Sequence, residues 1–126
     1  MKRKGNTMSK KITLVITHST DNHDRANAAI ALAASLISEG ADLTLFFIFE
    51  GALMARKGVA ETIEGRYLTP VRELFPMILE AKIPMYVCGA CVKAYEIPAD
   101  EIMDGFLITH IPTLAGEMMQ GETITF

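Results

Sequence analysis

The segment from residue 12 to residue 49 constrains the fold more than any other part of this 126-residue chain. It begins with a nearly continuous β-branched run at 12–17, which is typical of a strand buried on both faces. Apolar residues then recur at helical spacing over 21–39, and Gly40 is suited to end that helix in a left-handed conformation. A second apolar run follows at 43–49. This order predicts a β-α-β unit, whose two strands are parallel.

The remaining chain continues to alternate strand and helix patterns. We expect an irregular excursion over 50–69 with a short helix at 52–57, and then a helix from Thr69-Pro70 to about residue 81, in which Pro76 predicts a kink or a break. The other expected elements are strands at 83–87, 106–109 and 122–126 and helices at 90–96 and 113–120, the last closed by Gly121. The pattern predicts a single α/β domain over residues 11–126: a three-layer sandwich with a mainly parallel five-stranded sheet and the last strand at its edge.

Charge and hydropathy narrow the class of protein. Residues 1–11 hold five of the twelve Lys and Arg and no acid, so residues 12–126 carry seven bases against all fifteen acids. Such an acidic body repels phosphate backbones, and we expect no nucleic-acid partner. Residues 1–10 are expected to be a basic flexible tail without the apolar stretch of a secretory signal. No apolar run approaches the roughly 20 residues that cross a bilayer, which predicts a cytoplasmic protein with no membrane partner.

Four of the expected strands are followed directly by a residue that can carry chemistry. These residues are His18, Glu50, Cys88 and His110. Because the carboxyl ends of parallel strands share one edge of a sheet, where ligands gather, we expect these side chains to lie near one another. His110 is a candidate for taking a proton from the Cys88 thiol or for stabilising the thiolate. His18 and Glu50 are further supporting candidates.

Both cysteines of the chain lie in the run Cys88-Gly89-Ala90-Cys91. In an intracellular chain this spacing indicates redox chemistry, thiol transfer or metal binding. Cys88 is expected at a strand-to-helix turn, where backbone N–H groups favour the nucleophilic thiolate. A metal site with His18 and His110 stays open, although one such motif supplies only half of the four ligands of structural zinc. A dithiol exchanger and a non-catalytic subunit with inert thiols also stay open.

The run PMYVCGACVKAYEI at 84–97 resembles the active segment of the DsrE/DsrF/TusD-like sulfur-relay family, in which a strand leads to a cysteine and a short helix that often ends in Arg-Gly. The similarity extends over about residues 11–126 and includes Asp24-Arg25-Ala26 and the alanine-rich helix that follows. It implies a five-stranded α/β sandwich that assembles as a homo-oligomer, a trimer or a hexamer, with sulfur-donor and sulfur-acceptor proteins as partners.

The same resemblance implies a chemistry for the two thiols. Cys88 would carry sulfane sulfur as a persulfide and pass it to the thiol of the next protein, which requires no metal or organic cofactor. Cys91, absent from the TusD-type members, is the candidate resolving thiol, since a Cys88–Cys91 disulfide would release the sulfur as sulfide. Tyr95-Glu96 stand where many members have Arg-Gly, so this chain lacks the arginine that would stabilise an anion there. The predicted function is that of an intracellular sulfurtransferase-type carrier, and the alternative is a metal-binding or dithiol-redox module or a non-catalytic subunit.

Overall fold

The sheet contains five strands in the order β4-β3-β2-β1-β5. The computed structural model describes residues 9–126, so residues 1–8 of the expected basic tail lie outside the described part. All neighbouring strands pair in parallel, and β5 lies at an edge, as the sequence predicts. The strands are β1 (Lys11–Ile16), β2 (Asp42–Phe47), β3 (Met85–Cys88), β4 (Phe106–Thr109) and β5 (Glu122–Thr125).

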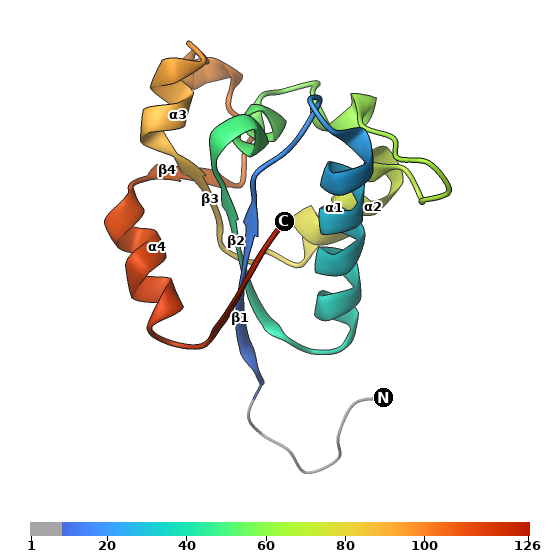
Figure 1. Cartoon of the computed structure of the whole chain (residues 1–126), viewed down its shortest axis with the longest axis vertical. Helices are drawn as coiled ribbons and strands as arrows, with labels where there is room; N and C mark the ends of the chain where they lie inside the picture. Colours follow the sequence, from blue (N-terminus) through green and yellow to red (C-terminus); the bar gives the residue numbers. More distant parts are fainter. Residues whose placement is uncertain (1–8) are drawn as a thin grey trace.

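Helices cover both faces of this sheet, which makes three layers (Figure 1). The helices α1 (His23–Ser38) and α2 (Val71–Glu80) pack together on one face, and α4 (Ile111–Met118) lies on the other. The short helix α3 (Gly89–Ala94) follows β3 directly. Three 3-10 helices lie in the connections: η1 (Phe49–Ala55), η2 (Ala60–Thr62) and η3 (Ala99–Glu101). Among residues 9–126, no helix has the length and apolarity to cross a membrane.

The strand β1, which lies between β2 and β5, is buried on both faces, and its alternating side chains belong to two apolar clusters. Leu14 and Ile16 belong to the main core, which the sheet forms with α1 and α2. Val15 points to the opposite face and belongs to a smaller cluster beneath α4. The members of this second cluster that are buried are Val15, Phe46, Ile48, Cys88 and Leu114.

Most element boundaries agree with the sequence pattern because the capping residues act as expected. The side chain of Asn22 accepts a hydrogen bond from the Arg25 N–H at 3.1 Å and so caps α1. Gly40 follows the end of α1 with a φ of 87°.

Several element boundaries differ from the sequence prediction. The helix α2 starts one residue later than predicted, after Pro70 as N-cap, and runs past Pro76 without a break. The helix α4 starts at Ile111 instead of residue 113, with a proline in its first turn, where the missing N–H costs nothing. Gly121 is not left-handed, and α4 ends at Met118. A Cβ at Gly121 would lie 2.3 Å from the Lys11 carbonyl oxygen, so glycine allows β1 and the approach to β5 to come together.

The excursion between η1 and α2 is fastened to α1 by a buried amide. Asn27, in the middle of the alanine-rich face of α1, is fully buried. Its Nδ2 donates to the Thr69 carbonyl at 2.8 Å, and its Oδ1 accepts from the Gly65 N–H at 2.8 Å. Asp24, one turn earlier, accepts from the backbone and the guanidinium of Arg66. These contacts fasten the excursion to the first turns of α1.

Candidate functional site

Cys88 is the last residue of β3 and the N-cap of α3, the strand-to-helix turn that the sequence predicts. Its side chain is only 3% exposed and packs in the apolar cluster beneath α4. It makes no capping hydrogen bond to α3, and a helix of six residues adds little dipole at its start. The thiol is therefore enclosed by apolar groups rather than set in an open anion site.

Cys91 lies one turn further along and is partly exposed. Both thiols are free, and Cys91 packs against both apolar clusters. Its Sγ accepts a hydrogen bond from the Phe49 N–H at 3.1 Å. Burial raises the pKa of Cys91, the Phe49 N–H lowers it, and the hydrogen bond and charge of neighbouring Cys88 raise it again. The net result is a pKa above the ordinary value.

The donor to Cys91 comes from a strained backbone position. Phe49 has a φ of 56°, in the left-handed region that a bulky residue rarely occupies. It is the first residue of η1, where an N–H has no partner within the helix. Gly51, two residues on, packs against β1 so closely that a Cβ there would lie 2.0 Å from the Ile16 carbonyl oxygen. This contact fixes η1 beside α3.

A second contact joins η1 to α3. The Tyr95 hydroxyl donates to Oε2 of Glu50 at 2.6 Å. This hydrogen bond, burial, and the negative charges of Glu50, Cys91 and Asp21 raise the pKa of Tyr95 to about 12. The phenol is therefore neutral at physiological pH, and its OH donates to the Glu50 carboxylate. Glu50, a predicted supporting residue, thus contacts the site by accepting the Tyr95 hydrogen bond.

His110 packs against the main chain beside Cys88. It is the N-cap residue of α4 and is exposed. A Cβ at Gly89 would lie 2.9 Å from Cε1 and 3.2 Å from Nδ1 of the imidazole, so only glycine lets the ring lie there. In the described residues no hydrogen bond joins His110 to either thiol. His110 therefore lies at the predicted edge of the sheet, where the strands end, and contacts Gly89.

His18 pairs with an acid instead of a thiol. Its Nδ1 lies 2.7 Å from Oδ2 of Asp21, whose Oδ1 accepts the Ser19 N–H at 2.8 Å. Burial raises the pKa of Asp21, but these hydrogen bonds and the charge of His18 outweigh it and leave that pKa below its ordinary value. The charge of Asp21 acts on Tyr95, which places this pair at the same edge. In the part of the chain that the structure describes, no hydrogen bond joins this pair to Cys88 or Cys91.

Two contributors to the site are absent from the sequence prediction. Phe49 acts through its backbone N–H, which carries no sequence signal. Tyr95 lies four residues after Cys91, the spacing that puts two side chains on one helix face. That spacing is the signal that could have identified it. Among residues 9–126, no group of three or more His, Cys, Asp or Glu is arranged to hold a metal ion.

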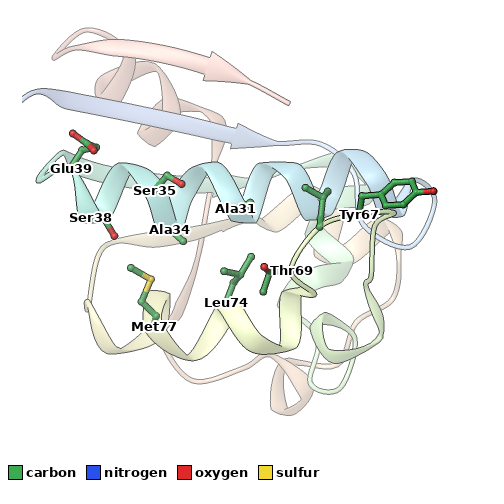
Figure 2. Close-up of a pocket in the computed structure, with 10 residues that line it drawn as sticks. Ala31, Ala34, Ser35, Ser38, Glu39, Tyr67, Thr69, Leu74 and Met77 are labelled. Atoms are coloured by element: carbon green, nitrogen blue, oxygen red, sulfur yellow. The ribbon is translucent and has the colours of Figure 1, made fainter. Parts of the chain in front are cut away.

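A separate groove lies on the other side of the molecule, between α1 and α2 (Figure 2). Its volume is about 600 Å³, and Ala34 of α1 faces Leu74 and Met77 of α2 across it. The fully exposed Tyr67 stands at one end. None of the predicted site residues lines this groove, so it is distinct from the thiol site.

Comparison with known proteins gives one family and several structures. The model of the DsrE/DsrF-like family matches residues 10–126. An uncharacterized protein of Methanopyrus kandleri is 24% identical over 115 residues, covering 91% of this chain and 92% of its own length. An uncharacterized protein of Methanocaldococcus jannaschii is 24% identical over 114 residues, covering 90% and 96%. The crystal structure of the YchN protein from E. coli superposes with a TM-score of 0.78 at 19% identity, covering 94% of this chain and all of that one. At this identity the superposition establishes a shared fold.

Proposed function

The chain belongs to the DsrE/DsrF-like family, and we propose that it carries sulfane sulfur as a persulfide on Cys88, with Cys91 as its working partner. Membership of this family supports a sulfur-relay role in general. The observation that carries the proposal is the pair of free thiols packed together at the carboxyl end of β3.

The chemistry needs only thiols and a sulfane-sulfur donor. A cysteine thiolate attacks the outer sulfur of a donor persulfide R–S–SH, a new S–S bond forms, and the donor leaves as R–S⁻. The product is a protein persulfide, which an acceptor thiolate discharges by the same displacement. With its apolar surroundings, Cys88 holds this labile group away from water and small thiols. Alternatively, Cys91 attacks the inner sulfur of the Cys88 persulfide, which forms the Cys88–Cys91 disulfide and releases hydrosulfide.

The test is intact-protein mass after incubation with polysulfide and removal of the donor. We expect one or more retained sulfur atoms on the wild-type protein, removable by a reducing agent. Cys88→Ser should lose the retained sulfur, and the double variant Cys88→Ser/Cys91→Ser serves as the blank. If reduced wild-type protein with both thiols titratable acquires no sulfur, the carrier function is wrong.

A dithiol-redox function is the second candidate, because the same two thiols are free and adjacent. It would appear as a measurable Cys88/Cys91 reduction potential and as reduction of a test disulfide by the wild-type protein. A persulfide carrier loads sulfur without consuming reducing equivalents. The two measurements on one preparation therefore separate these functions.

We also propose that the protein assembles with copies of itself through β4 and α4. The edge strand β4 exposes Leu107 by 62% and Ile108 by 47%. The adjoining α4 region exposes Ile111 by 51% and Met119 by 87%. A monomer rarely leaves so many neighbouring apolar side chains in water. A second copy of the chain offers the same apolar groups and would cover them.

A further inference from the structure

We propose that sulfur enters this protein at Cys91 and is then handed to Cys88, so that the two thiols act in a fixed order. This inference rests on the proposed sulfur-carrying function and adds the direction of transfer within the pair. Two observations support it. Cys88 is buried while Cys91 is partly exposed, and the backbone N–H of Phe49 donates to the sulfur of Cys91.

The two thiols differ in how accessible they are to a donor protein. A donor persulfide must bring its outer sulfur into line with the attacking thiolate, so the attacking sulfur needs an open approach. Cys88 is 3% exposed and is enclosed by Val15, Phe46 and Leu114. Cys91 is partly exposed on α3. A donor persulfide on another protein can therefore reach Cys91 more easily than Cys88.

The backbone of Phe49 favours the same order. Its N–H donates to the Cys91 sulfur at 3.1 Å. An N–H donor stabilises negative charge on a sulfur, both when Cys91 attacks as a thiolate and when it leaves as one. The Cys88 side chain, by contrast, accepts no capping hydrogen bond from the first turn of α3. The fixed donor therefore suits Cys91 to be the thiol that takes sulfur and then releases it.

The handover is a balanced displacement. In the first step, the Cys91 thiolate attacks the outer sulfur of R–S–SH, giving Cys91–S–SH and R–S⁻. In the second step, the Cys88 thiolate attacks the outer sulfur of that persulfide. The Cys88–S bond forms, the Cys91–S bond breaks, and its electron pair stays on Cys91 as the thiolate that the Phe49 N–H stabilises. No oxidant or reductant is consumed, and Cys91 packs against the apolar cluster that contains Cys88, which brings the two thiols together.

The experiment follows both sites in time. Reduced protein is mixed with inorganic polysulfide, quenched with iodoacetamide at intervals, and analysed by intact mass and peptide mapping. In the wild type we expect sulfur on Cys91 first and on Cys88 later. Cys88→Ser should load Cys91 at least as fast as the wild type, because the neighbouring thiol that raises the Cys91 pKa is gone, and should lose that sulfur when the donor is removed. Cys91→Ser and Cys91→Ala should load Cys88 at least about tenfold more slowly, since attack then requires local opening around a buried thiol.

The outcomes separate the order of transfer from the function itself. If both Cys91 variants load Cys88 at the wild-type rate, the order is wrong while the carrier function stands. If sulfur appears on Cys88 before Cys91 in the wild type, the order is equally wrong. If neither thiol loads in any variant whose circular dichroism matches the wild type, the proposed function fails. The double variant Cys88→Ser/Cys91→Ser controls for sulfur that adds elsewhere.

Discussion

At the scale of single residues, the surroundings of Cys91 have opposing effects on the pKa of its thiol. Burial and neighbouring Cys88 raise its pKa, and the Phe49 N–H lowers it. Glu50, Tyr95, His110 and the His18–Asp21 pair also lie at this edge, and the Tyr95 phenol stays neutral up to about pH 12. A raised thiol pKa means that less thiolate is present at neutral pH, so alkylation of Cys91 should keep accelerating as the pH rises past the ordinary value of 9.0.

Site-resolved alkylation with iodoacetamide across a pH series checks this expectation. In the wild type the midpoint for Cys91 should lie above 9.0. In Cys88→Ser it should lie lower than in the wild type, because the contribution of the neighbouring thiol is gone. A wild-type midpoint at or below 9.0 would contradict the burial of Cys91 that the structure shows.

The pair Tyr95-Glu96 shows how this chain departs from the Arg-Gly of many family members. Glu96 has a φ of 54°, a conformation that glycine adopts freely and other residues adopt at a cost. The backbone turn that suits glycine is therefore kept without glycine. Tyr95 supplies a hydrogen bond to Glu50 in place of a cation. At this position the site is therefore held by a neutral phenol bonded to a carboxylate.

How far sequence predicts the site depends on the kind of group involved. Cys88, Glu50 and His110 were predictable at one edge because Cys88 ends β3, His110 follows β4 and Glu50 comes shortly after β2, all parallel strands of one sheet. The Tyr95–Glu50 bond joins residues 45 positions apart, and such pairing depends on how η1 packs on α3. The Phe49 donor is a backbone group in a strained conformation, which no residue pattern specifies.

At the scale of elements, α1 depends on one polar residue within an apolar face. Asn27 is fully buried and satisfies the Gly65 N–H and the Thr69 carbonyl. Asn27→Leu keeps the helix and the approximate volume but leaves both backbone groups without a partner. We expect unfolding free energy to fall by about 2–4 kcal/mol, since each unsatisfied buried group costs about 1–3 kcal/mol.

Denaturant unfolding of the purified variant measures this loss. Ser35→Ala, on the exposed side of the same helix, is the matched control and should change stability by less than about 0.5 kcal/mol. A stability of Asn27→Leu equal to that of the wild type would mean that the excursion over 56–70 contributes little to the fold. Hydrogen exchange at Gly65 should accelerate in the variant.

Sequence patterns predicted the type and order of the strands and long helices because periodicity and caps act locally. The Asn22 cap and Gly40 fix both ends of α1 within one turn of the helix. The 3-10 helix η1 was placed three residues late, because its start depends on the close packing of Gly51 on β1. A contact between distant segments of this kind carries no local period.

At the scale of the whole molecule, the apolar surface of β4 and α4 predicts an assembly of like copies. Leu107 of β4 and Met119 after α4 are exposed by 62% and 87%. Replacing both with glutamate should shift the protein from oligomer to monomer, because burying a carboxylate in an apolar contact is costly. Size-exclusion chromatography with light scattering measures the mass directly.

The control for this prediction is Tyr67→Glu, which changes an equally exposed ring beside the groove between α1 and α2. It should leave the oligomer intact. A monomeric wild-type protein would refute assembly altogether. Dissociation by Tyr67→Glu alone would place the interface on the opposite face of the sheet.

The pairing of the last strand with the first has a consequence for how the chain acquires its structure. Thr17, just after β1, bonds the Phe126 carbonyl across 109 positions of sequence, and β5 completes the sheet beside β1. Contacts so distant along the chain are slow to form, because the intervening loop must close before they give any stabilisation. During synthesis the edge of β1 that pairs with β5 therefore stays unpaired until β5 has left the ribosome. Folding of this domain is therefore complete only when β5 has paired with β1.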